Sequence, residues 1–209
     1  LYRTNAQSRV IEESFMQAGI RYRMYGGLKF YDRKEVKDIL AYLRVMINPA
    51  DDISVRRIIN VPKRAIGDTT VAELAKHAAQ EEMPLLTACM DMPESISSRA
   101  RKNVEKFSEL MMNLTMMAET MKLTDLVQYV IDTVGLESQY TKEDSDEARS
   151  RVENIREFVG AVKEFEEKAD NPTLTEYLEN VSLVSDLDEL GEDGGAVTMM
   201  TLHSAKGLE

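Results

Sequence analysis

The sequence lacks several features that would place it in familiar functional classes. No apolar run approaches the roughly 20 residues that a membrane-spanning helix needs, so no membrane partner is expected. The single cysteine, Cys89, cannot form an internal disulfide, and it favours a reduced, cytoplasmic setting in which it serves as a small core residue. The two histidines and the one cysteine stand far apart, which argues against a zinc site with the usual ligand spacing.

The sequence also lacks a recognisable nucleophile arrangement. It contains no G-x-S-x-G turn of the kind that presents the serine of α/β hydrolases. His203 and Ser204 are adjacent, so the imidazole is poorly placed to deprotonate that hydroxyl. A serine-hydrolase function is therefore not favoured.

Charge is unevenly distributed along the 209 residues. The whole chain has a formal net charge of −11, but residues 1–64 carry +6 and residues 65–209 carry −17. A basic first third suggests a site for a polyanion on that part. Solvated helix faces explain the same asymmetry equally well.

The first 48 residues alternate between strand and helix patterns. Short strands are predicted at 1–4 and 21–25, with a helix between them that ends at Gly19. A further helix begins at Asp32 and stops at Asn48-Pro49. One apolar face of the first helix is expected to consist of Val10, Ile11, Phe15 and Ala18.

The middle of the chain, from about residue 51 to 183, shows helical spacing throughout. An acidic, glycine-rich linker is predicted at 185–195, followed by a buried strand at 196–202. One strand cannot stand alone, so the strands at the start of the chain are its expected partners. The helices are predicted over 53–61, 68–80, 83–90, 96–121, 124–135, 145–169 and 174–183.

Polar residues crowd into the end of the sequence, TLHSAKGLE at 201–209. A loop that follows a parallel strand lies at the carboxyl edge of the sheet, where α/β proteins bind ligands. His203 and Ser204 offer hydrogen bonds to a phosphodiester, and Lys206 offers a positive charge. Glu209 can accept a hydrogen bond from a sugar hydroxyl.

A second polar cluster lies in INVPKRAIGDTT at 59–70. A helix that begins at Asp68 or Thr69 directs its free N–H groups toward the preceding turn, where a phosphate could bind. An ordinary loop with a helix cap is the alternative interpretation. The candidate phosphate-binding residues here are Lys63, Arg64, Gly67, Thr69 and Thr70.

Four segments together resemble the UvrD/PcrA/Rep family of superfamily 1 DNA helicases, and within it the PcrA branch. They are LYRTNAQSR, YGGLKFYDRKEVKDILAYLR, INVPKRAIG and MTLHSAKGLE, in this order and at this separation. The resemblance covers the whole chain. It implies a mainly α fold, in which a helical 2B-type domain is inserted into an incomplete RecA-like α/β subdomain of the P-loop NTPase type.

The resemblance also implies a division of the chain into parts. Residues 1–30 and 190–209 correspond to two pieces of subdomain 2A, and residues 31–189 correspond to the helical domain 2B. The family's G-x-x-x-x-G-K-[ST] loop, its acidic Mg²⁺ motif and its arginine-bearing motif VI are not in the sequence. The chain is therefore expected to be a fragment of an ATP-dependent 3′–5′ DNA helicase, inactive alone, with ATP and Mg²⁺ bound only by the full-length enzyme.

Individual roles follow from the matched motifs. Arg3, Asn5 and His203 match positions that contact the backbone of single-stranded DNA, and Glu209 matches the residue that holds the ribose of the nucleotide. In the family the segment around Gly67 is the GIG motif, which grips duplex DNA. Ala65 departs from that motif, because it stands where the first glycine usually is, and its Cβ is expected to hinder a positive φ. Weaker candidates for the single-strand groove or for motor coupling are Thr201, Ser204 and Lys206.

Two other functions stay open at this point. The chain could be a non-catalytic module that binds DNA or docks onto repair or transcription proteins. An unrelated helical scaffold would require four ordered motif matches to be accidental. The segment MTLHSAKGLE favours a helicase as the parent protein, because a free-standing binding domain would not need it.

Overall fold

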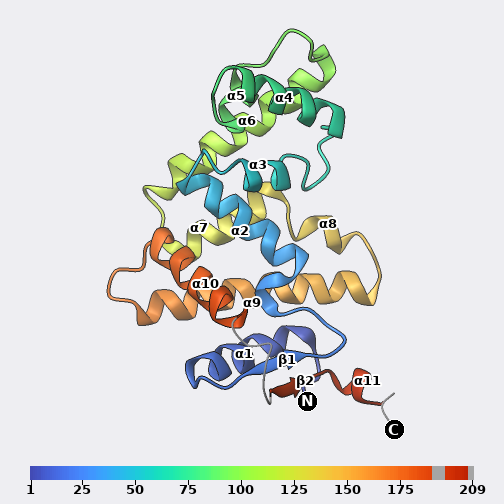
Figure 1. The fold of residues 1–209 in the computed structure, drawn as a ribbon, viewed down its shortest axis with the longest axis vertical. Helices are drawn as coiled ribbons and strands as arrows, with labels where there is room; N and C mark the ends of the chain where they lie inside the picture. Colours follow the sequence, from blue (N-terminus) through green and yellow to red (C-terminus); the bar gives the residue numbers. More distant parts are fainter. Residues whose placement is uncertain (190–195, 207–209) are drawn as a thin grey trace. The chain divides into compact units, whose positions relative to one another are not determined.

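A computed structural model describes residues 1–189 and 196–206, without the side chains of 184–189 and of His203 (Figure 1). The fold is mainly helical, and its strands are short. The elements are η1 (Asn5–Gln7), α1 (Ser8–Gln17), β1 (Tyr22–Met24), η2 (Phe30–Asp32), α2 (Lys34–Ile47), α3 (Asp52–Ile58), α4 (Asp68–Gln80), α5 (Leu85–Met90), α6 (Ser98–Ala118), α7 (Leu123–Val134), α8 (Ser138–Thr141), α9 (Asp146–Lys168), α10 (Leu174–Glu189), β2 (Val197–Met199) and α11 (Leu202–Ala205).

The chain packs as two compact units. One unit contains Leu1–Lys37 together with the residues from Tyr140 onward, and the other contains Asp38–Gln139. The expected division into 1–30, 31–189 and 190–209 stays a prediction. Part of the expected linker, residues 185–189, belongs to α10, whereas 190–195 lie outside the described residues.

The first unit contains the sheet. β1 and β2 pair in parallel, with Tyr22 opposite Val197 and Met24 opposite Met199. This pairing confirms that the strand near the end of the chain returns to the strands at its start. The predicted strand 1–4 is reduced to one bridge, between Tyr2 and Thr201.

The apolar face predicted for α1 is wrong. Val10 is 51% exposed, whereas the buried residues of α1 are Ser8, Arg9 and Glu12. The buried side is polar because it faces polar groups of other elements. Glu12 accepts hydrogen bonds from the backbone N–H of Phe30 (3.1 Å) and from the hydroxyl of Tyr22 (3.2 Å).

A second polar contact in this unit joins the start of α2 to α9. The guanidinium of Arg33 donates to Asn154 Oδ1 (2.8 Å) and to Ser8 Oγ (2.5 Å). Asn154 in turn donates to Glu35 Oε1 (2.5 Å). Buried polar groups need such partners, since an unpaired one costs its full desolvation free energy.

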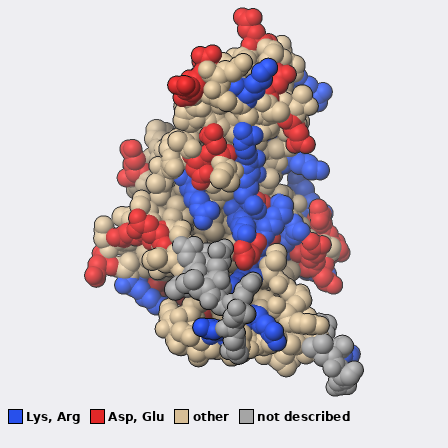
Figure 2. Space-filling model, in the orientation of Figure 1, with Lys and Arg blue, Asp and Glu red and all other residues tan. Residues whose placement is uncertain are grey.

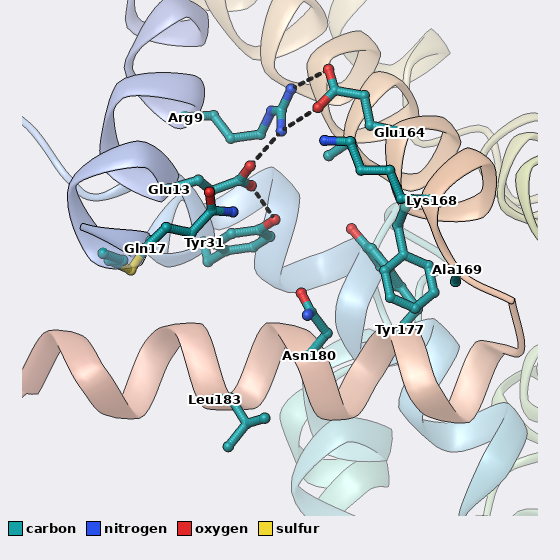
Figure 3. A pocket seen from close by; sticks show the side chains of 13 residues that line it. Arg9, Glu13, Gln17, Tyr31, Glu164, Lys168, Ala169, Tyr177, Asn180 and Leu183 are labelled. Carbon is teal, nitrogen blue, oxygen red and sulfur yellow. Dashed lines mark hydrogen bonds and ion pairs between the residues drawn. The ribbon is translucent and has the colours of Figure 1, made fainter. Parts of the chain in front are cut away.

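α1, η2, α9 and α10 also surround a cavity of about 460 Å³ (Figure 3). Some of its polar lining is paired, since Arg9 binds Glu164 and Tyr31 donates to Glu13 (2.9 Å). The hydroxyl of Tyr177 is buried there without a hydrogen-bond partner within the described part of the chain.

The second unit is helical and has an apolar core. α5 packs against α3, α4 and α6, and α6 packs against α7. Local caps fix several helix ends: Asp51 accepts from Ser54 N at the start of α3, and Ser97 accepts from Ala100 N at the start of α6. Gly135 ends α7 in the left-handed conformation, with φ 80°, at the residue where the predicted helix 124–135 ends. Fully buried core residues include Leu74, Leu85, Cys89, Val104 and Phe107.

Candidate nucleic-acid interface

The first candidate surface lies beyond the bridge between Tyr2 and Thr201, next to the two-stranded sheet. Tyr2 N donates to Met200 O (3.2 Å), and Leu202 N donates to Tyr2 O (2.9 Å). Tyr25 N donates to Met199 O (2.8 Å) on the opposite edge of the same segment. Residues 197–201 therefore lie between Tyr2 and β1, and the residues that follow them begin beside Arg3. This is the carboxyl edge that the sequence predicted.

Arg3 and Asn5 are presented to solvent by a tight turn. Gln7 Oε1 accepts from the backbone N–H of Arg3 (3.1 Å) and of Thr4 (3.3 Å), which fixes the start of η1. The carbonyl of Asn5 accepts from Ser8 Oγ (2.9 Å). Both the Arg3 and the Asn5 side chains are exposed, so they are available to a polyanion.

The neighbouring segment 201–206 is held by its own hydroxyl groups. Thr201 Oγ1 accepts from Ser204 N (3.1 Å) and lies 2.9 Å from Ser204 Oγ, which caps α11. Ser204 Oγ lies 3.4 Å from the point where a Cβ on Gly26 would stand. Gly26 has φ +70°, so a side chain there would be both strained and crowded. Thr201 and Ser204 are thus occupied with each other, whereas Lys206 is exposed.

Two predicted residues of this edge, His203 and Glu209, lie partly or wholly outside the part of the chain that the structure describes. The backbone of His203 lies in α11, and its side chain lies outside the described residues. Glu209 also lies outside them. Their roles stay predictions.

The second candidate surface is the turn between α3 and α4, in the second unit. Gly67 precedes α4 with extended backbone and no capping side chain, and a Cβ there would meet no atom within 4 Å. Thr69 is exposed, and Thr70 is partly buried. Asp68, the first residue of α4, is exposed and adds a carboxylate that opposes anion binding.

The basic residues of this turn behave differently from each other. Lys63 is exposed, as expected for a phosphate contact. The guanidinium of Arg64 faces the protein: Nη1 donates to the carbonyls of Ile58 (3.0 Å) and Val61 (3.0 Å), and Nη2 donates to the hydroxyl of Tyr42 (2.7 Å). These carbonyls lie at and just beyond the C-terminus of α3, where a cation is favourable.

Tyr42 was not predicted from the sequence to matter for this turn. Its side chain is fully buried, and its hydroxyl donates to Val61 O (2.6 Å). Burial raises the pKa of Tyr42 to about 12, and the nearby charge of Arg64 offsets part of that rise. The guanidinium carbon of Arg64 also lies 5.9 Å from the ring centre of Tyr42 and 5.6 Å from that of Phe107.

Asn60 was missed as well, and it fixes the backbone of the turn. Its Oδ1 accepts from the backbone N–H of Arg64 (2.7 Å) and of Ile66 (3.4 Å). Asn103 of α6 donates from Nδ2 to Ala65 O (3.4 Å). An asparagine beside a Pro-Lys-Arg turn is a weak local signal, because its partners can be assigned only once the turn geometry is known.

The expectation for Ala65 needs correction. Ala65 adopts φ 56° despite its Cβ, so the methyl group does not prevent the left-handed conformation. Such a conformation costs an L-residue about 1–2 kcal/mol. The turn therefore has the backbone expected of a glycine at this position, together with some strain.

Charge is mixed on the molecular surface. Figure 2 shows both basic and acidic side chains on the face drawn. Within the described ranges, no cluster of three or more His, Cys, Asp or Glu side chains is placed to hold a metal ion. No helix in that part of the chain has the length and apolar character needed to cross a membrane.

Comparison with known proteins identifies the family. The family described as the UvrD-like helicase C-terminal domain matches residues 1–209. The ATP-dependent DNA helicase PcrA of Bacillus subtilis (strain 168) is 45% identical over 216 residues, and that of Staphylococcus aureus (strain Mu50 / ATCC 700699) is 43% identical over 212 residues. Each alignment covers 100% of this chain and 29% of the relative, so the chain spans under a third of the length of these relatives. The chain belongs to the UvrD-like helicase C-terminal domain family.

Proposed function

We propose that this chain is the part of an ATP-dependent 3′–5′ DNA helicase that contacts DNA through two surfaces. The 45% identity to a PcrA helicase across the whole chain is the observation that carries the proposal. The sequence contains no G-x-x-x-x-G-K-[ST] loop, so ATP and Mg²⁺ are assigned to the longer protein, and the chain alone is expected not to hydrolyse ATP.

The single-strand surface would use Arg3, Asn5 and His203. The bridge between Tyr2 and Thr201 supports this assignment, because it sets the residues that follow Tyr2 and those that follow Thr201 side by side. A motor that moves along DNA grips phosphates, since they carry charge but no sequence information. Glu209 would hold the ribose of the nucleotide in the longer protein.

The duplex surface would use Lys63, Gly67, Thr69 and Thr70. The exposure of Lys63 and the open space around Gly67 support it, because both leave room for a phosphate. The helix start at Asp68 supplies backbone N–H groups that no capping side chain takes. Arg64 is turned inward and is not included.

Fluorescence anisotropy tests both surfaces when it is measured with a tailed duplex, which carries a 3′ single-stranded tail, and separately with blunt duplex and with single-stranded DNA. Lys63→Ala should weaken binding to blunt duplex and lower the salt slope by about 1, whereas Lys122→Ala, which removes another exposed lysine, should not. Arg3→Ala should weaken binding to single strands, with Arg99→Ala as its control.

Absence of binding at low salt would overturn the proposal. The chain would then be better described as a protein-docking module, which its acidic residues 65–209, with a net charge of −17, would favour. In that case repair or transcription proteins would be its partners.

A further inference from the structure

The two adjacent basic residues of the α3–α4 turn have opposite orientations. Lys63 is exposed, and no ion-pair partner is found for it among the residues described. Both terminal nitrogens of Arg64 are already bonded, Nη1 to carbonyls of the turn and Nη2 to Tyr42. An arginine that grips a phosphate with two parallel hydrogen bonds needs two free N–H groups on one edge. The Nη1 N–H groups are taken by carbonyls of the turn, so Arg64 cannot grip a phosphate through both of its terminal nitrogens.

The bonds of Arg64 join the end of α3, the turn that follows it and α2. Nη1 contacts the carbonyls of Ile58 (3.0 Å), Val61 (3.0 Å) and Pro62 (3.3 Å). Nη2 contacts the hydroxyl of Tyr42 (2.7 Å), which itself donates to Val61 O. The Arg64 side chain thus links the end of α3 and residues 61–62 to the buried side chain of Tyr42 on α2.

The residues just after Lys63 are fixed from the other side. Asn60 Oδ1 holds the backbone N–H groups of Arg64 and Ile66, and the Ile66 side chain is only 1% exposed. Lys63 is therefore an exposed residue on a turn whose backbone is held by hydrogen bonds both before and after it. A side chain on a fixed backbone loses less conformational freedom when it binds a ligand.

We propose that Arg64, acting with Tyr42, is a positioning residue for duplex DNA and not a phosphate contact. It holds the turn so that Lys63 and the start of α4 are presented together. This inference rests on the proposed duplex function of the turn, and it names the residues on which that function depends.

Two substitutions separate positioning from contact. Arg64→Lys keeps the positive charge, but one ammonium cannot reproduce the fork that spans the carbonyls and Tyr42. Tyr42→Phe removes one hydroxyl from a side chain that is fully buried and cannot reach DNA. Tyr129→Phe is the matched control, because it removes a hydroxyl that bonds Asn113 in the same unit (3.0 Å).

The measurement is the affinity of the 209-residue variants for blunt duplex and for single-stranded DNA, by fluorescence anisotropy. Arg64→Lys and Tyr42→Phe should each weaken duplex binding by about three- to tenfold, the loss expected for one or two hydrogen bonds. Single-strand affinity should stay within about twofold, whereas general unfolding would lower both affinities. Tyr129→Phe should change neither.

A double mutant adds a test of mechanism. If Tyr42 acts by presenting Lys63, the loss in Tyr42→Phe with Lys63→Ala should be smaller than the product of the two single losses. Independent losses that multiply fully would overturn the positioning role.

The outcomes also separate this inference from the function on which it rests. If Lys63→Ala weakens duplex binding but Arg64→Lys and Tyr42→Phe bind as the wild type does, the positioning role is wrong and the duplex site stands. If Lys63→Ala has no effect on duplex affinity, the duplex site itself is wrong and the positioning role with it. Should Arg64→Lys fail to fold, Tyr42→Phe alone decides between these results.

Discussion

The guanidinium of Arg9 bonds the carboxylate of Glu157, with Nε 2.7 Å from Oε1, although the two residues lie 148 positions apart in the sequence. Arg9 also bonds Glu13 (2.8 Å) and Glu164 (3.0 Å), as Figure 3 shows. Burial by itself lowers the pKa of Arg9, but the hydrogen bonds that Arg9 donates to Glu157 and Glu164 and the charge of Glu13 outweigh it and raise the pKa. These ion pairs join α1 to α9 on the side of α1 whose buried residues are polar.

Replacing Arg9 should therefore destabilise the protein. Arg9→Met removes the buried cation and leaves three carboxylates close together, so the free energy of unfolding should fall by about 2–4 kcal/mol. Urea unfolding followed by circular dichroism measures it. Arg149→Met is the control, because the Arg149 side chain is 63% exposed and its ion pairs with Asp144 and Asp146 lie in solvent. A similar change in both variants would contradict a structural role for the cluster.

The strained alanine in the α3–α4 turn predicts a stabilising substitution. Ala65→Gly should raise the free energy of unfolding by about 0.5–1 kcal/mol, because the relief of a left-handed alanine exceeds the added freedom of glycine in the unfolded chain. Thermal or urea unfolding measures the change.

The same chemical change elsewhere in the unit supplies the control. Ala72 is exposed within α4, so Ala72→Gly should lower stability by about 1 kcal/mol. The two variants are expected to shift stability in opposite directions. Equal destabilisation by both would show that the backbone at Ala65 is not strained.

Local sequence signals predicted most of the secondary structure. The helix predicted at 68–80 is α4, and the helix predicted at 124–135 is α7, which Gly135 ends in the left-handed conformation. These features depend on apolar spacing and on turn residues within a few positions of each other. The pairing of the late strand with β1 was also predictable, because a lone strand leaves its backbone groups unpaired.

Features that depend on distant residues were not predictable in this way. The buried face of α1 could not be predicted from the local sequence, because the carboxylates that pair with Arg9 include Glu157 and Glu164 on the distant helix α9. The inward hydrogen bonds of Arg64 were not predictable either, because its acceptors are carbonyls that only the folded turn directs toward it, and Tyr42 comes from another helix. Charge alone therefore did not distinguish Lys63 from Arg64.

The buried thiol of Cys89 predicts slow alkylation. Burial, with a smaller contribution from the charge of Asp52, raises the pKa of Cys89 from 9.0 to about 12. The thiol is fully buried, so iodoacetamide at about pH 8 should react with the folded protein at least tenfold more slowly than with the urea-unfolded chain. Equal rates would mean that α5 opens readily.

The same shift predicts a pH dependence of stability. The folded state holds the thiol proton more tightly than the unfolded state does, so this contribution to stability is fully present below about pH 9 and is lost as the pH rises toward about 12. Cys89→Ala should make the fall in unfolding free energy over that range shallower. An unchanged slope would contradict the raised pKa.

Asp68 is expected to weaken the duplex binding proposed for the α3–α4 turn. Its carboxylate stands in the first turn of α4, beside the N–H groups proposed to meet a phosphate, and it is exposed. Asp68→Asn should tighten duplex binding by about two- to fivefold at low salt, and the gain should shrink as salt screens the charge. The same change should cost about 0.3–1 kcal/mol of stability, because an acidic side chain favours a helix N-terminus.

Affinity and stability are thus expected to move in opposite directions at this residue, which distinguishes a local electrostatic effect from a general improvement in folding. Asp125→Asn is the matched control, since Asp125 lies in the first turn of α7 and is also exposed. It should lose similar stability with a smaller gain in duplex affinity. Equal gains from both variants would show that DNA responds to the net charge of the chain, and that the α3–α4 turn is not where the duplex binds.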